Sequence, residues 1–152
     1  MQRLAWVVAA TLGSLWSSQR PMGGMLRPAA LGSEPDGQLT LTSPTRVCAS
    51  RVAVADTLTM PAVGRLMEGS ILPPGSSVLL AITEAHVSRG PSDPIRLSFA
   101  IHELRLPSGE RVRLAGAVAS ADVERARLPF ARFDACIPAG GHVVLVSVRR
   151  GS

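Results

Sequence analysis

Residues 95–114 read IRLSFAIHELRLPSGERVRL, and apolar and polar side chains alternate along them up to a turn signal. Four apolar residues share one face of an extended strand: Ile95, Leu97, Phe99 and Ile101. After His102 the apolar positions shift by one residue, to Leu104 and Leu106. A β-bulge produces such a shift, so we expect a strand with a bulge near His102 and Glu103.

The end of this strand has the sequence of a tight hairpin. Pro107 and Gly109 occupy the second and fourth positions of the turn LPSG, which suits a type I turn whose glycine adopts a positive φ. The resulting three-residue loop aligns Leu104 with Val112, Glu103 with Arg113, and Arg105 with Arg111. We therefore expect an antiparallel hairpin with one apolar pair, one attractive charged pair and one repulsive pair of arginines.

In the body of the chain, short apolar runs alternate with turn residues, which is typical of an all-β sandwich or barrel. Residues 71–82 and 136–147 repeat one pattern, a Pro-x-Gly turn that leads into a strand apolar on both faces. Residues 119–133 also fit a short helix, with Ser120 or Asp122 as its cap. The sequence predicts an all-β fold, a single small barrel or sandwich of about six to eight mostly antiparallel strands.

The composition excludes several classes of protein. A chain of 152 residues, 46% of them hydrophobic, suits one globular domain and excludes a wholly disordered protein. All 16 basic residues are arginine, and lysine, asparagine and tyrosine are absent, which indicates a GC-rich, bacterial genome rather than selection for guanidinium chemistry. The net charge is +5, and Arg3, Arg20 and Arg27 precede the first acidic residue. Because the remaining excess is small and aromatic residues are few, we expect no nucleic-acid partner.

The N-terminus has the form of an export signal. Residues 1–18 combine a basic start with roughly a dozen apolar residues, fewer than the about 20 that a transmembrane helix needs. We expect this leader to be disordered or helical, residues 19–44 to form a flexible linker rich in Pro, Gly and Ser, and residues 45–152 to form the β domain. The predicted location is the periplasm or cell envelope of a bacterium, without a transmembrane span. The alternative is a misassigned start or an N-terminal piece that stays attached.

Three stretches share a pattern with known proteins: GSILPPGSSV at 69–78, RLSF at 96–99 and LPSGERV at 106–112. The pattern resembles that of small exported bacterial β-domain proteins of unknown role, and of the β-barrel part of TrbI-type conjugation channel proteins. The resemblance covers residues 69–114 and implies a β fold and a cell-envelope setting. The helical insertion and long Pro-rich arm of the conjugation proteins have no counterpart here, so the resemblance implies no channel role and supplies no catalytic residues.

The chain has two cysteines, Cys48 and Cys136. In an exported protein an even number of cysteines favours a disulfide, and we expect these two to be joined. The alternative is a pair of buried free thiols that pack as small hydrophobic side chains.

No recognisable spacing of catalytic or metal-binding residues is present. The histidines are His86, His102 and His142, and none of them forms a metal-binding motif. Glu84 and His86 are two residues apart and would share a strand face, which we interpret as a polar strand edge. We therefore predict no catalytic, cofactor-binding or metal-binding residues, no cofactor, and no enzymatic activity.

These observations predict an exported cell-envelope β-domain protein that acts by binding or assembly. An apolar sheet edge would let it recruit a protein partner by strand addition. Two alternatives stay open: a component of a conjugation or secretion apparatus, and a small hydrolase or metal-dependent enzyme whose site combines distant residues. The oligomeric state is not indicated by the sequence.

Overall fold

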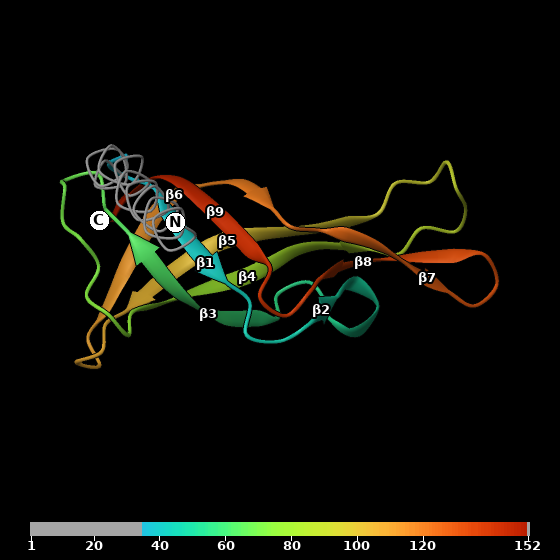
Figure 1. Ribbon diagram of the computed structural model, residues 1–152, viewed down its shortest axis with the longest axis horizontal. Coiled ribbons are helices and arrows are strands. Elements are labelled where there is room, and N and C mark those ends of the chain that lie inside the picture. The colour runs from blue at the N-terminus through green and yellow to red at the C-terminus, as the bar shows by residue number, and fades with distance from the viewer. Residues whose placement is uncertain (1–34, 152) are drawn as a thin grey trace, which may run out of the picture. The chain divides into compact units, whose positions relative to one another are not determined.

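The computed structural model describes residues 35–151. Six strands form a closed antiparallel barrel in the order β1-β3-β4-β5-β6-β9, and a three-stranded sheet has the order β2-β8-β7 (Figure 1). The barrel strands are β1 (Leu39–Thr42), β3 (Thr57–Gly64), β4 (Ser77–His86), β5 (Arg96–Arg105), β6 (Arg111–Ala121) and β9 (His142–Arg150). The other elements are β2 (Val47–Cys48), a 3-10 turn η1 (Ala49–Arg51), β7 (Glu124–Leu128) and β8 (Arg132–Ile137). The all-β prediction is confirmed.

The hairpin between β5 and β6 has the predicted register. Leu104 pairs with Val112, Glu103 with Arg113, and Arg105 with Arg111, and Gly109 has a φ of +93°. The Glu103 carboxylate lies 3.0 Å from Nε of Arg105 and 3.9 Å from Nε of Arg111. It therefore forms its ion pairs with the two arginines that face each other, which reduces their repulsion, rather than with Arg113 as expected.

The predicted bulge lies on β5. Leu79 of β4 pairs with Glu103 and the next residue, Leu80, pairs with Ile101, so His102 has no partner on β4. The inward positions move accordingly from Leu97 and Phe99 to Leu104. The bulge is thus confirmed, and it keeps the apolar residues on both sides of it inside the barrel.

The two repeated segments form equivalent turns. Gly75 and Gly140 have positive φ values of 89° and 83°. Before β4, the Ser76 amide donates to the Pro73 carbonyl (3.2 Å), and before β9 the Gly141 amide donates to the Pro138 carbonyl (2.9 Å). These hydrogen bonds and the glycine conformation are typical of type II turns, which explains the Pro-x-Gly spacing.

Two expectations about segment boundaries are wrong. Residues 39–44 were expected in the linker, but Leu39–Thr42 is strand β1, which closes the barrel between β3 and β9. Leu39 and Leu41 are fully buried, and this burial outweighs the weak strand signal of the Pro- and Gly-rich sequence around them. The helical alternative for residues 119–133 is also wrong, because this segment forms the end of β6, strand β7 and the start of β8. The expected signal segment 1–18 and the linker up to residue 34 lie outside the described residues.

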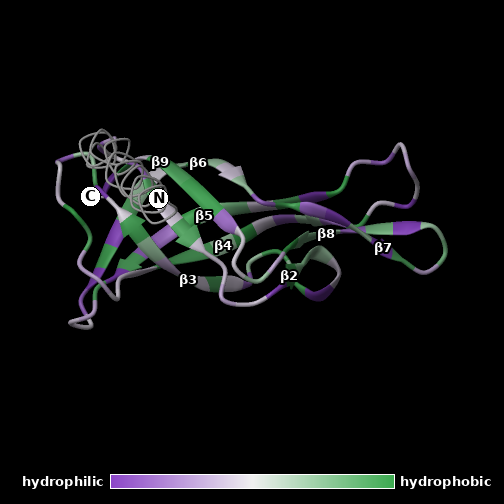
Figure 2. Ribbon diagram, in the orientation of Figure 1, coloured by the Kyte–Doolittle hydropathy of each residue, from purple (hydrophilic) through white to green (hydrophobic). Residues whose placement is uncertain are grey.

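The barrel interior is filled by aliphatic side chains, and Figure 2 shows the hydrophobic residues along its strands. The largest fully buried residues include Leu39, Met60, Leu80, Ile82 and Leu145. At the end of β3, Gly64 has a φ of +137°, and a Cβ there would overlap the Gln38 carbonyl oxygen. Only glycine therefore allows β1 and β3 to approach this closely.

Candidate functional site

Cys48 and Cys136 form a disulfide that joins β2 to β8. They are directly opposite each other in the antiparallel pair, with Cα atoms 4.1 Å apart. β2 pairs with β8 at only two positions, so the covalent bond holds a strand that is too short to pair stably by itself. The predicted disulfide is therefore present in the structure.

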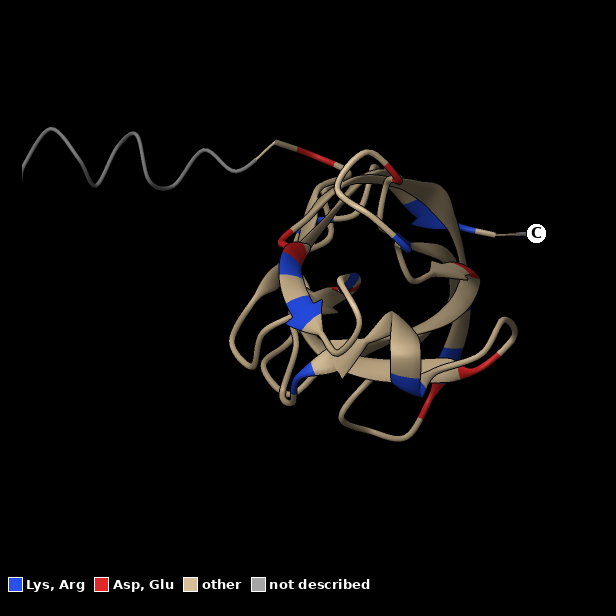
Figure 3. Ribbon diagram, turned by 90° about the vertical axis from the view of Figure 1, so that its right-hand side faces the viewer, with Lys and Arg blue, Asp and Glu red and all other residues tan. Residues whose placement is uncertain are grey.

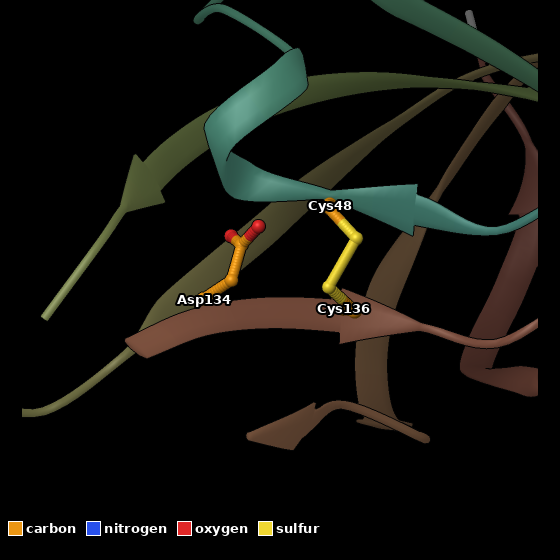
Figure 4. Close-up of side chains that lie close together, drawn as sticks. All are labelled: Cys48, Asp134 and Cys136. Carbon is orange, nitrogen blue, oxygen red and sulfur yellow. A yellow bond between two sulfur atoms is a disulfide. The ribbon is translucent and has the colours of Figure 1, made fainter. Parts of the chain in front are cut away.

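Asp134 is a buried acidic residue beside the disulfide, and it was not predicted from the sequence. It lies two residues before Cys136, on the same face of β8 as the disulfide, and is 3% exposed (Figure 4). Its carboxylate accepts hydrogen bonds from the backbone amides of Ser50 and Ala135, each at 3.0 Å, and from the Ser50 hydroxyl. The signal in the sequence was an acidic residue inside the otherwise apolar strand FDACI.

The donor atoms of Cys48, Asp134 and Cys136 lie within 4.8 Å of one another, the one such group of potential metal ligands in the described residues 35–151. Both sulfur atoms are consumed by the disulfide, and the carboxylate is held by three donors. We interpret the group as structural: the disulfide and the hydrogen bonds between Ser50 and Asp134 hold η1 against β8.

The three histidines lie at separate places. Nε2 of His86, at the end of β4, is 3.2 Å from the Asp93 carboxylate, and Nδ1 of His142, at the start of β9, is 3.6 Å from Asp122. His102 is the bulged residue of β5. The structure therefore brings no two of these histidines into one site, although Glu84 and His86 border the same open hollow of about 420 Å³.

The pKa of the Asp93 carboxyl is lowered below its usual value of 3.8. The main cause is the hydrogen bond donated by the Arg89 backbone amide (3.0 Å), and the His86 side chain contributes next. This aspartate orders the loop between β4 and β5.

The strands β5 and β6 separate beyond their hairpin. They pair at three positions only, next to the turn, so within residues 35–151 residues 96–101 of β5 have ladder partners on β4 alone and the bulged His102 has none. The corresponding half of β6 pairs with β9. Bulges on both strands accompany the separation, at His102 on β5 and at Ala119 on β6, and bulges bend the strands that contain them.

A groove follows the line of separation between β5 and β6, with a volume of about 420 Å³; we call it the seam groove. Its lining contains no charged side chain. The lining residues are Leu97, Ser98 and Phe99 from β5, Val118, Ala119, Ser120 and Ala121 from β6, and Val123. The structure therefore has an open strand edge beside a groove without charged side chains, and an open edge can accept an added strand.

No protein-family model, curated protein or solved structure matches this chain. The resemblance to exported β-domain proteins and TrbI-type channel proteins therefore stays a prediction. No helix within residues 35–151 is both long enough and apolar enough to cross a membrane.

Proposed function

We propose that this chain is an exported protein of the bacterial cell envelope that binds an extended polypeptide segment of a partner protein in the seam groove. The added segment would form backbone hydrogen bonds with residues 96–102 of β5. Its alternate side chains would enter the apolar lining next to Leu97 and Phe99. The observation that carries the proposal is the β5–β6 ladder, which ends after three residue pairs and leaves the edge of β5 open.

Two further features support the cell-envelope part of the proposal. The N-terminal segment of the sequence has the pattern of an export signal. A disulfide between Cys48 and Cys136 suits an oxidising compartment such as the periplasm. The apparatus-component and hydrolase alternatives remain predictions, and no feature of the described residues favours either of them.

Photo-crosslinking in the native host tests the binding proposal. A photoreactive phenylalanine replaces Ser98 on β5 or Ser120 on β6, which line the two sides of the seam groove. The control position is Thr59, an exposed residue of β3 outside the groove. We expect both groove positions to crosslink to one and the same protein, through one continuous segment of it, and Thr59 not to do so.

A charge placed in the groove provides the matched perturbation. Ala119 and Ala117 are both exposed on β6, but only Ala119 lines the groove. Ala119→Lys should reduce crosslinking from Ser98 by roughly tenfold or more, because an added strand would bury the ammonium group without a partner. Ala117→Lys should have little effect. Crosslinking that is absent, equally strong from Thr59, or unaffected by Ala119→Lys would contradict the proposal.

The export proposal has a separate test. Cell fractionation and intact-mass measurement should find the chain in the periplasmic fraction and shortened at its N-terminus. A full-length chain that begins at Met1 and stays in the cytoplasm would contradict export without deciding whether the seam groove binds a partner.

A further inference from the structure

The turn of the β7–β8 hairpin displays apolar side chains at its apex. The apex has the sequence Leu128-Pro129-Phe130-Ala131, and the Phe130 side chain is 93% exposed, the most exposed of the large hydrophobic residues described. In Figure 2 this turn has the hydrophobic colour between hydrophilic stretches. An exposed aromatic side chain at the apex of a hairpin is not buried by folding, so it is available to contact a ligand or surface outside the domain.

The backbone of the turn is also unusual. Phe130 and Ala131 have φ values of +64° and +54°, in the left-handed region where glycine or asparagine is the common choice. The chain thus places a bulky phenylalanine at a position that disfavours it. Such exceptions to local preference concentrate at functional positions.

Arginines surround the apolar apex. Arg127 and Arg132 lie directly on either side of it, and Arg89 lies in the loop between β4 and β5, which is joined to β8 by the two backbone hydrogen bonds between Ser88 and Phe133. Among residues 35–151 none of these three guanidinium groups has a carboxylate partner within 4.0 Å. Figure 3 looks at this end of the domain, with the arginines in blue.

A fourth arginine fixes the two loops to each other. The Arg125 guanidinium donates to the Gly90 carbonyl (3.0 Å) and the Ser88 hydroxyl (3.3 Å), and it lies 4.2 Å from the centre of the Phe133 ring. The nearest acidic residues of these segments are occupied, since Asp93 contacts His86 and Glu124 pairs with Arg46. The end of the domain is therefore a surface with an excess of positive charge, on which Arg125 links the β7–β8 hairpin to the β4–β5 loop.

An open hollow next to the apex has a volume of about 600 Å³ and is lined by Arg89, Arg132, His86, Val87 and Phe130. Arg89 and Arg132 both border this hollow, and guanidinium groups are well suited to bind phosphate oxygens. The Phe130 ring borders the same hollow, so it would lie beside the molecule that carries the bound phosphate group.

We propose that this arginine-flanked apex, formed by residues 127–132 together with Arg89, docks on the surface of a bilayer that contains anionic lipid. Phe130 and Leu128 would enter the boundary between head groups and acyl chains, and Arg89, Arg127 and Arg132 would contact lipid phosphates. A membrane is favoured over an acidic polypeptide because the highly exposed Phe130 lies at the apex of the turn, between Arg127 and Arg132. This proposal does not depend on the seam groove.

Vesicle flotation of the protein purified from its native host tests the proposal. The probes are vesicles of phosphatidylcholine alone and of phosphatidylcholine with phosphatidylglycerol. The wild-type chain should bind the anionic vesicles and bind less as salt is added. Arg127→Gln with Arg132→Gln should weaken this binding about 30-fold, from the usual contribution of a surface arginine, and Phe130→Ser should weaken it about tenfold.

Control variants keep the result specific to this surface. Arg113→Gln with Arg149→Gln removes the same charge from two exposed arginines on β6 and β9, and Val63→Ser removes an exposed apolar side chain from β3. Both controls should bind like the wild type. The proposal is overturned if the wild type ignores anionic vesicles, if it binds neutral and anionic vesicles equally, or if test and control variants lose affinity equally. Binding of a polyglutamate peptide in preference to the vesicles would assign the surface to an acidic polypeptide and would also overturn it.

Discussion

Removal of the disulfide is the perturbation whose cost can be worked out most fully. The bond closes a loop of 88 residues, and in the chain-entropy model such a crosslink stabilises the folded state by about 4.5 kcal/mol. We expect the free energy of unfolding to fall by this amount, because β2 pairs with β8 at two positions only and this pairing cannot replace the covalent bond. Without it, we expect residues 47–51 to detach from β8, which would also remove the hydrogen bonds between Ser50 and Asp134.

The assay is urea unfolding of the wild type and of Cys48→Ala with Cys136→Ala, followed by far-ultraviolet circular dichroism. With a typical slope of about 1.5 kcal/mol per molar urea for a domain of this size, the midpoint should fall by roughly 2.5–3 M. Reduced wild type is the control, because it keeps both side chains and loses only the bond. A shift below about 0.5 M in both samples would show that the disulfide does not stabilise the fold, and two reactive thiols in the unreduced native protein would show that the bond is absent.

Three further predictions concern single positions. Asp134→Ala should lower the free energy of unfolding by about 2–3 kcal/mol, because it leaves the Ser50 and Ala135 amides without their acceptor, and urea unfolding would detect this. Gly64→Ala should cost about 3 kcal/mol or more through overlap with Gln38, whereas Gly69→Ala, at a φ of +90° with no atom within 4 Å, should cost only about 1 kcal/mol in the same assay. The lowered pKa of Asp93 means that its contribution to stability is complete above pH 3.8 and is lost as the pH falls through the lowered value. A carboxyl NMR titration should place that pKa below 3.8, and Asp93→Asn should remove the corresponding acid-dependent part of stability.

Each of these three predictions can be contradicted by a specific result. A stable Asp134→Ala protein would mean that the buried carboxylate is not held as described. Equal losses for Gly64→Ala and Gly69→Ala would mean that β1 and β3 do not approach as closely as the structure places them. A normal or raised pKa for Asp93 would contradict the hydrogen bond from the Arg89 amide.

Local sequence signals predicted the parts of the fold that depend on a few consecutive residues. The register of the β5–β6 hairpin follows from a three-residue loop with glycine at its end, and the bulge at His102 follows from the change of hydrophobic phase. The pairing of Cys48 with Cys136 follows from their number and the expected compartment. The hairpin and the bulge leave their marks on adjacent positions of the chain, whereas the disulfide was predicted from the number of cysteines alone.

The candidate site could not be predicted in the same way, because distant segments create it. The seam groove exists because β5 and β6 diverge after the third residue pair, and neither strand alone indicates that they separate. The arginine-flanked apex combines Arg89 with residues 127–132, which lie far from it in the sequence. Strand β1 was missed because its four residues become a strand only by pairing with β3 and β9.

Amide hydrogen exchange along β5 is the decisive measurement for partner binding, because binding requires an edge that is open in the free protein. Alternate amides within residues 96–102 should exchange quickly, while the amides of residues 103–105 that face β6 should be protected by the hairpin. A peptide covering the segment that crosslinks to Ser98 and Ser120 should then protect the fast amides. Uniformly slow exchange through the whole of β5 in the free protein would show that the edge is already paired and cannot accept a partner strand.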